Sequence, residues 1–245
     1  MPLLSTPDLI ALAFFVVAWT GYAVTVEWTP HGRDGLSAAM DRYREVWMQQ
    51  MLARDMRMVD MQVMASLQNG TAFFASTSLI AVGGALTLLR STDEILSVVA
   101  EMPFGLQTSR ALWEAKTIGL IVIFVYAFFK FAWSYRLFNY VAILLGGTPP
   151  AAERDNPDAE AHVMRTTKLF RSAGRHFNRG QRALFFALGY LGWFVGPWVF
   201  VASTLAVVTV LWRRQFVSEA RRALDATHGE LETVAPRRAW MRRKH

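Results

Sequence analysis

The chain has 245 residues, of which 53% are hydrophobic and only 18% are charged, and it contains no cysteine. Soluble domains carry nearer a quarter charged residues, so this composition indicates a membrane protein, and the lack of cysteine excludes disulfides, thiolate metal sites and cysteine nucleophiles. The net charge is +7, but the arginines flank apolar runs and no nucleic-acid-binding motif accompanies them. They therefore indicate anionic lipid headgroups and topology, and no nucleic-acid partner is expected.

Four apolar runs cover residues 8–28, 71–89, 117–145 and 183–212. Each is long enough to cross a hydrocarbon core, which takes about 20 residues of helix. No basic segment precedes the first run and no small-residue cleavage site follows it, so it is interpreted as a retained span, not a signal peptide. The sequence predicts an all-α polytopic membrane helix bundle with four principal hydrophobic helices, two of them extended by long charged cytoplasmic helices.

The segment from Ser37 to Gln68 contains no Gly or Pro and is rich in strong helix formers. It predicts one helix that begins near Ser37 and continues into the second span over roughly fifty residues, or about 75 Å. Four methionines on it fall at helical spacing and form one stripe: Met48, Met51, Met58 and Met61. Clustered thioethers can bind copper(I), but without cysteine or a nearby histidine a packing role is favoured and no metal is expected.

The second span is unusually rich in small and polar residues, namely Thr71, Ser76, Thr77, Ser78, Gly83, Gly84 and Thr87. Small residues let helices approach closely in lipid. The sequence therefore predicts that this span lies at the centre of the bundle, and a permeation path along it is the alternative.

Residues 90–116 link the second and third spans and predict a short amphipathic helix on the membrane surface. The third span ends at the breaker sequence 146–150, and 158–181 is predicted to be the second charged helix. The fourth run is interrupted by Gly196-Pro197, which indicates either one kinked helix or a re-entrant hairpin. Residues 1–226 are predicted to form a single integral membrane domain, followed by a basic, disordered tail over 227–245.

The distribution of Lys and Arg sets the expected orientation, because an excess of these residues marks the cytoplasmic side. Four simple spans divide the flanking basic residues thirteen against twelve, whereas a hairpin at Gly196-Pro197 divides them twenty-two against three. We expect an external N-terminus, both charged helices in the cytoplasm and a location in the bacterial inner membrane. The side of the tail stays open.

Lys130 follows a run of thirteen residues without a charged side chain, and a charge in a membrane span is costly. Counting along antiparallel spans places it level with Ser76 and Tyr22. The candidate intramembrane polar cluster comprises Lys130, Ser76, Tyr22, Ser134, Asn139 and Asn178. Lys130 either lines a polar cavity or extends its ammonium group to the headgroups.

The same count predicts two contacts between helices. Glu27 is level with Arg136, so the two are expected to form an ion pair at the inner interface, the alternative being that each reaches the headgroups separately. Asn139 and Asn178 fall at matching depth and are expected to hydrogen-bond.

A charged and aromatic cytoplasmic cluster is predicted before the second span, comprising Arg44, Trp47, Arg54, Asp55, Arg57 and Asp60. Its charges indicate a solvated or interhelical network. The five histidines form no ligand set, and Ser-His-Asp, P-loop and dinucleotide patterns are absent. No enzymatic activity and no cofactor are expected.

Several stretches together resemble an uncharacterised family of bacterial and plant membrane proteins over roughly residues 5–225. They are Arg44-x-x-Trp47, Arg54-Asp55-x-Arg57-x-x-Asp60, Phe73-Phe74-Ala75-Ser76-Thr77, Tyr126-Ala-Phe-Phe-Lys130-Phe-x-Trp133-Ser134-x-Arg136 and Phe177-Asn178-x-Gly180-x-Arg182. The resemblance implies a multi-pass integral membrane protein and supplies no catalytic or binding residues.

Two functions are consistent with these features. A non-enzymatic scaffold or accessory protein would associate through its cytoplasmic helices, as a homo-oligomer or with another membrane protein. The alternative is a small transporter or channel for an anionic or polar solute, with a polar cavity around Lys130. A missing internal repeat and the lack of a carboxylate for ion coupling favour the scaffold.

Overall fold

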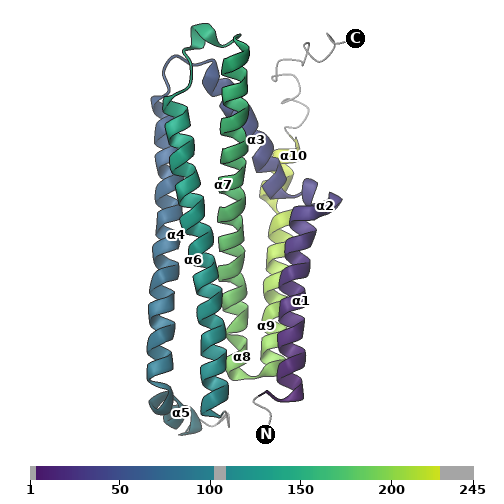
Figure 1. Cartoon of the computed structure of the whole chain (residues 1–245). Helices are drawn as coiled ribbons and strands as arrows, with labels where there is room; N and C mark the ends of the chain where they lie inside the picture. The colour runs from purple at the N-terminus through teal and green to yellow at the C-terminus, as the bar shows by residue number, and fades with distance from the viewer. Residues whose placement is uncertain (1–3, 102–108, 227–245) are drawn as a thin grey trace.

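The computed structural model describes residues 4–101 and 109–226, and these ranges contain helices and connecting turns but no strand (Figure 1). The helices are α1 (Thr6–Trp28), α2 (Pro30–Arg33), α3 (Leu36–Leu52), α4 (Met58–Arg90), α5 (Thr92–Glu101), α6 (Arg110–Gly146), η1 (Ala151–Glu153), α7 (Pro157–Tyr190), α8 (Gly192–Val195), α9 (Pro197–Trp212), the π-helical η2 (Arg213–Val217) and α10 (Glu219–Ala226). Four described segments are long and apolar enough to cross a membrane: α1, α4, α6 and the helix over Pro197–Leu224. The predicted all-α bundle with four principal hydrophobic helices is confirmed. The basic tail predicted over 227–245 lies outside the described residues.

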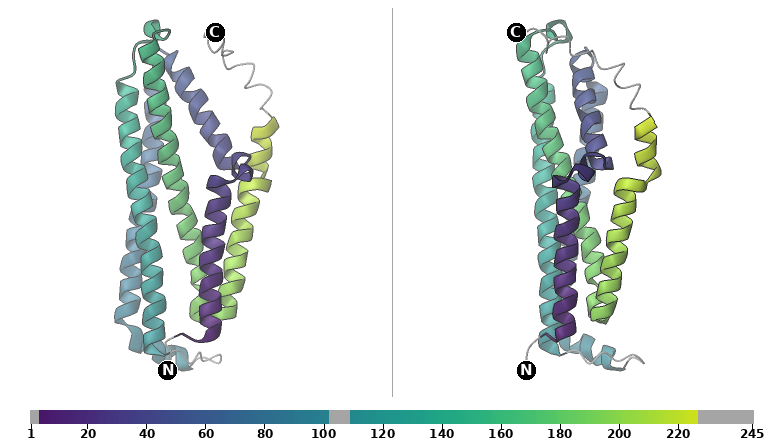
Figure 2. Two further views of the ribbon diagram at one scale, coloured as in Figure 1. Left: turned by 45° about the vertical axis from the view of Figure 1, so that its right-hand side comes forward. Right: turned by 90° about the vertical axis from the view of Figure 1, so that its right-hand side faces the viewer.

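The chain passes back and forth along one long axis. We call the end where α1 begins and α5 lies the lower end, and the end where α3 leads into α4 the upper end (Figures 1 and 2). Helices α1 and α3 rise, α4 descends, α6 rises, α7 descends and α9 rises. Helix α7 lies at the centre and packs against α6, α9 and α3. At about 1.5 Å per residue, the 33, 37 and 34 residues of α4, α6 and α7 make them about 50–55 Å long, so they extend well beyond α1.

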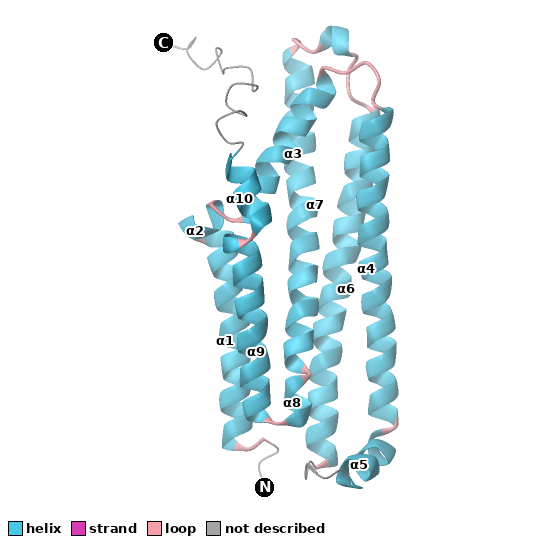
Figure 3. Ribbon diagram, turned by 180° about the vertical axis from the view of Figure 1, so that it is seen from behind, coloured by secondary structure: helices cyan, strands magenta, loops and turns pink. Residues whose placement is uncertain are grey.

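Helix α4 lies at the edge of the molecule, so the prediction that the second span forms the centre is wrong (Figure 3). Its main partner is α6, which it contacts through a narrow seam of residues about seven positions apart: Met64, Thr71, Ser78 and Ala85. A seven-residue repeat gives one contact line between two helices. Ser76, Thr77, Gly83 and Gly84 lie off this line and are exposed. Small residues therefore bring α4 close to one neighbour only.

The chain reverses at Gly196-Pro197, so the fourth run is a hairpin of two antiparallel helices and not one kinked helix, while its re-entrant nature stays a prediction. Helix α9 runs back along α7, and the Ser203 hydroxyl donates to the Gly189 carbonyl at 2.6 Å. A Cβ atom added at Gly192 would lie 2.3 Å from Ser203 Oγ, so glycine permits this close approach of α8 and α9. In chain order α6 rises, α7 and α8 descend, and α9 rises again, so α7 runs antiparallel to both α6 and α9 (Figure 1).

The helix predicted from Ser37 into the second span is broken at residues 53–57, and α4 runs antiparallel to α3. Side chains in and beside this break form hydrogen bonds to residues distant in the sequence, and these bonds outweigh the helical propensity of residues 53–57. The indole Nε1 of Trp47 and Nη1 of Arg54 both donate to Asp60 Oδ1, at 2.6 and 2.8 Å. Arg57 donates to the carbonyls of residues 148 and 149 at the top of α6, at 2.6 and 2.5 Å. These bonds join the reversal to the neighbouring turn.

The reversal also divides the methionine stripe. Met48 and Met51 are fully buried with Met64 against α6 and α7, whereas Met58 is 77% exposed and Met61 is 40% exposed. The single stripe was wrong because it assumed one continuous helix. The buried methionines fill a core, as their flexible side chains do well.

Asp60 provides a direct test of this reversal, since its carboxylate is 2% exposed and holds both Trp47 and Arg54. Asp60→Ala leaves an indole donor unpaired and should lower the free energy of unfolding by about 1–3 kcal/mol. The measurement is chemical denaturation in detergent micelles. Asp55→Ala is the matched control, because Asp55 is exposed, and it should change stability by less than about 0.5 kcal/mol. Equal effects of the two changes would contradict the proposed role of Asp60.

Candidate functional site

Tryptophans and charges delimit an apolar layer across the lower half of the molecule. Trp113 and Trp133 are twenty residues apart on α6, or about 30 Å, which matches the thickness of a hydrocarbon core. Large apolar side chains between them face outward, among them Ile118, Val122 and Phe129. On α1, Asp8 and Trp28 are spaced equally. We call the region between these residues the apolar layer, with Trp28 and Trp133 at its upper boundary.

Lys130 lies close to that upper boundary, one turn before Trp133. Its Nζ is 5.0 Å from the ring centroid of Tyr126, and it forms no ion pair among the described residues. It lines neither of the two cavities described below. This position agrees with an ammonium group reaching toward the headgroup level.

The other members of the predicted polar cluster do not converge on Lys130. Ser76 is exposed, and the Tyr22 hydroxyl donates to the Leu211 carbonyl at 3.1 Å. The Ser134 hydroxyl donates to the Ala173 carbonyl at 2.8 Å. Asn139 accepts from Gln68 Nε2 at 2.7 Å, and Asn178 Nδ2 donates to Ser37 Oγ at 3.3 Å, so the predicted Asn139–Asn178 bond is not formed. These residues join separate helix pairs.

Glu27 pairs with Arg179 and Arg182 of α7, not with Arg136. Arg179 Nε lies 3.0 Å from Glu27 Oε1 and its Nη2 lies 2.5 Å from Oε2, while Arg182 Nη2 contacts Oε1. Arg136 is exposed and donates to the Tyr140 hydroxyl on its own helix. The predicted pair was wrong because α7 lies between α6 and the upper end of α1, so its arginines reach Glu27 first.

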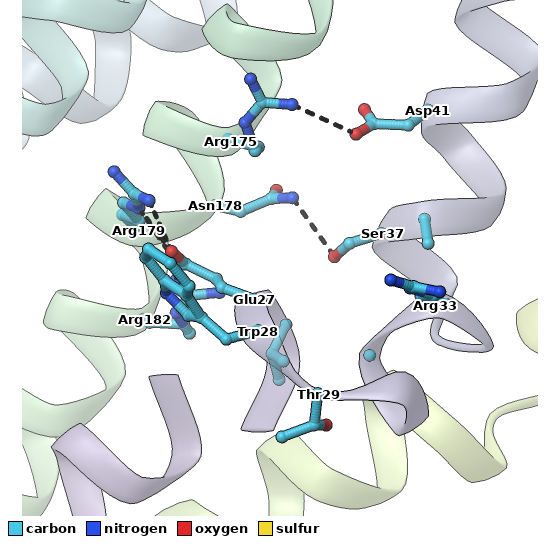
Figure 4. Close-up of a pocket in the computed structure, with 13 residues that line it drawn as sticks. Glu27, Trp28, Thr29, Arg33, Ser37, Asp41, Arg175, Asn178, Arg179 and Arg182 are labelled. Atoms are coloured by element: carbon cyan, nitrogen blue, oxygen red, sulfur yellow. Dashed lines mark hydrogen bonds and ion pairs between the residues drawn. The ribbon is translucent and has the colours of Figure 1, made fainter. Parts of the chain in front are cut away.

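An arginine-lined cavity of about 440 Å³ opens above this ion pair (Figure 4). The end of α1 supplies Glu27 and Trp28, and α2 and the start of α3 supply the opposite wall. Its charged and polar side chains are Glu27, Thr29, Arg33, Ser37, Asp41, Arg175, Asn178, Arg179 and Arg182. A second cavity of about 140 Å³ shares Ser37, Asn178 and Arg182 with it and adds Arg44 and Arg214.

Electrostatics at this level favour anions. The hydrogen bond to Glu27 raises the pKa of Arg179 further above its usual range, so this guanidinium stays charged. Burial, followed by the positive charges of Lys130, Arg179 and Arg175, lowers the pKa of His176 to about 4. This imidazole is therefore neutral at pH 7, since the surroundings oppose one more positive charge.

The predicted cytoplasmic cluster divides into two structural networks. Trp47, Arg54 and Asp60 hold the reversal together, and Arg57 ties it to the next turn. The other network contains Arg44 on α3, and the exposed Asp55 forms no ion pair with any described residue.

Arg44 instead joins α3 to α7. Its Nη1 pairs with Asp41 Oδ1 at 2.6 Å, and its guanidinium lies 5.4 Å from the ring centroid of Phe170. A Cβ atom at Gly174 would lie 2.7 Å from Arg44 Cζ, so the glycine makes room for this contact. The geometry gives Arg44 a packing role.

The sequence reasoning missed a buried polar group at the lower end. Lys116 is 3% exposed and donates from Nζ to the Trp193 carbonyl at 2.8 Å, and Trp193 Nε1 donates to Asp8 Oδ1 at 2.7 Å. Asp8 also forms a capping box with Ser5 at the start of α1. Asp8 was visible as the only charge before the first span, but its partner Trp193 is 185 residues away along the chain. This group fastens α8 to α1 and α6.

Among the described residues, no group of three His, Asp or Glu side chains could hold a metal ion. The arginine-lined cavity can instead bind anions, because guanidinium groups bind carboxylates and phosphates through paired hydrogen bonds.

Removing the carboxylate of Glu27 should destabilise the junction of α1 and α7. Glu27→Ala leaves Arg182, which is 11% exposed, without its anion, and should lower the free energy of unfolding by about 1–3 kcal/mol. Arg136→Ala should change it by less than about 0.5 kcal/mol. Denaturation of both variants in the same detergent measures the two changes in the free energy of unfolding. A larger loss in Arg136→Ala than in Glu27→Ala would contradict the pairing of Glu27 with Arg179 and Arg182 and favour the pairing with Arg136.

Comparison with known families agrees with the resemblance found in the sequence. Residues 10–220 match the family DUF599, described as "Protein of unknown function". No curated protein and no solved structure matches the chain. The match covers most of the helical bundle, from the second turn of α1 to the start of α10, and the chain therefore belongs to the DUF599 family.

Proposed function

We propose that this is a multi-pass protein of the bacterial inner membrane that acts, without catalysing a reaction, as a scaffold or accessory protein. It self-associates through the outer face of α4. The observation that carries this proposal is the edge position of α4, which packs along α6, meets α3 and α7 only in its upper part, and leaves its outer face open.

The open face of α4 is uncharged and offers both small and large apolar residues. From Met61 to Leu89 the helix contains no charged residue. Phe73 is 66% and Ile80 is 75% exposed, and Cβ atoms added at Gly70, Gly83 or Gly84 would meet nothing within 4 Å. In lipid, helices associate where small residues permit close backbone approach, so this face suits a second helix.

The upper part of α4 supports a protein partner more strongly, because it lies above the apolar layer. Phe74 stacks on Phe131 at the boundary, and Arg57 binds the turn at the top of α6, so the segment between them lies above the apolar layer and its exposed side chains face water. Apolar side chains exposed in this part or beside it are Met56 (82%), Met58 (77%), Val59 (66%), Met61 (40%), Val63 (42%) and Leu67 (37%). An apolar patch in water usually marks an interface.

A second copy of the chain is the occupant that these features favour. An uncharged strip meets its own two-fold mate without like-charge repulsion, although the chain as a whole carries +7. The same strip continues from water into the apolar layer, so a copy in the same membrane can cover both parts together.

The distribution of arginines supports the membrane orientation. At the lower end, the described basic residues are Arg90, Arg110 and Lys116, whereas α3, α7 and α10 together carry ten of the other eighteen described Lys and Arg residues. By the positive-inside rule, the upper end faces the cytoplasm and α1 begins outside. Anionic headgroups are the expected lipid partners, and nucleic acid is not an expected one.

The transporter alternative has less support. Its central residue, Lys130, lines neither described cavity, and the polar residues expected around it bond elsewhere. The open face of α4 supports assembly more directly, so assembly is the better-supported role.

The proposed orientation can be tested by cysteine labelling, because the chain has no native cysteine. Glu94→Cys on α5 should react with a membrane-impermeant maleimide in intact spheroplasts. Arg154→Cys at the upper turn should react only after the membrane is permeabilised. Both positions are exposed, so the contrast reports sidedness. The reverse pattern would overturn the orientation.

Self-association predicts disulfide crosslinking across α4 in native membranes. Ile80→Cys should yield an oxidant-dependent dimer on a non-reducing gel, with at least a fivefold excess over Val17→Cys. Val17 is the matched control, since it is 68% exposed and lies in the apolar layer on α1. A scan of Phe73→Cys, Ile80→Cys and Gly83→Cys that gives no more dimer than Val17→Cys would remove the α4 interface.

A further inference from the structure

The two arginine-lined cavities form one basic site at the upper boundary of the apolar layer. They share Ser37, Asn178 and Arg182, and together they are lined by six arginines against two carboxylates. Arginine clusters repel one another, so an arrangement of this kind is favourable where an anion binds. The larger cavity, at about 440 Å³, has the size of a small-ligand pocket.

The two carboxylates leave part of this positive charge available. Glu27 is occupied by Arg179 and Arg182, and Asp41 is held by Arg44 at 2.6 Å. Arg175 lies 3.8 Å from Asp41 and is 50% exposed, so its guanidinium can still bind a ligand. Arg33 is exposed on the opposite wall and pairs with no carboxylate among the described residues. Arg33 from α2 and Arg175 from α7 therefore line the cavity from two different walls, Arg33 with no carboxylate partner among the described residues and Arg175 with only the long contact to Asp41 (Figure 4).

Neutral groups in the same cavity can also engage an anion. Asn178 Nδ2 donates to Ser37 Oγ at 3.3 Å, and Ser37 Oγ donates to Gln215 Oε1 at 3.2 Å. Both bonds are long, so the two donors can turn to a better acceptor at little cost. Gln215 Nε2, in the smaller cavity, is buried and has no hydrogen-bond partner in the described structure. The set of donors fits a ligand with several oxygen acceptors.

The height of the cavity identifies the class of ligand. Trp28 lines it, is 81% exposed and stands at the upper boundary of the apolar layer, where tryptophans meet lipid headgroups. Basic pockets at this level on the cytoplasmic side suit the phosphates of anionic lipids. We propose that the cavity between α1, α3 and α7 binds a phosphate group, supplied by the headgroup of an anionic phospholipid in the cytoplasmic leaflet. This site is separate from the α4 face and does not require self-association.

The test uses the full chain in a neutral detergent and two probes. Mixed micelles with phosphatidylglycerol should raise the melting temperature, while the same fraction of phosphatidylcholine should not. In Arg33→Gln/Arg175→Gln, the apparent dissociation constant for phosphatidylglycerol should rise at least tenfold. The control Arg154→Gln/Arg165→Gln removes equal charge from exposed arginines outside the cavity and should keep wild-type affinity.

Each outcome decides the proposal. Equal protection by both lipids, or equal loss of affinity in both double variants, would overturn it, because either result indicates unspecific lipid or charge effects. Inorganic phosphate forms the second arm: protection as strong as that by phosphatidylglycerol would show a water-soluble phosphate ligand and overturn the lipid source. The melting temperature without lipid should be the same for wild type and Arg33→Gln/Arg175→Gln, since neither arginine holds Glu27. The readout is independent of α4 crosslinking, so the two proposals can fail separately.

Discussion

The structure depends on one constraint: α7 must carry a charged helix down to an apolar layer and then continue through it. Arg179 and Arg182 arrive at the boundary on the face toward α1, where a free guanidinium would be costly. Glu27, at the last turn of α1, meets both. From Ala183 onward the helix is apolar, with Leu188 62% exposed on its outer surface. The Glu27 carboxylate therefore neutralises the last basic residues of α7, so that within one turn the helix continues into the apolar layer.

The lower end of the hairpin formed by α7, α8 and α9 needs a second set of polar contacts, because apolar side chains alone do not fix the register of packed helices. Asp8, Lys116 and Trp193 provide it, and they lie about one layer thickness below Glu27. Between the two sets of polar contacts, Phe15, Tyr190 and Phe200 form edge and tilted ring contacts that fill the space between α1, α7 and α9. Polar bonds at both ends set the register, and aromatic packing supplies the bulk of the contact.

Hydropathy alone was sufficient to find the four apolar runs, because run length is a direct consequence of layer thickness. Hydropathy did not reveal that α7 returns through the apolar layer, because only its part from Ala183 onward is apolar and its upper part is charged. That omission misassigned the partner of Glu27. The break at 53–57 was equally hidden, because it contains no Gly or Pro and depends on Arg57 binding carbonyls about 90 residues away. Small residues on α4 were recognised, but composition does not tell whether a helix is at the centre or the edge.

Helix α3 packs tightly against its neighbours near its top and more loosely near Ser37. This difference separates polar groups that stabilise the fold from those that can bind a ligand. Met48, Met51 and Phe170 close the region near the top of α3 with buried apolar contacts. Lower on α3, near Ser37, the contacts with α7 are long and polar, and the cavities open there. A helix pair that packs tightly at one end and is held by replaceable hydrogen bonds at the other can admit a ligand without losing its register. The boundary of the apolar layer is thus the level at which this fold has kept room for a ligand.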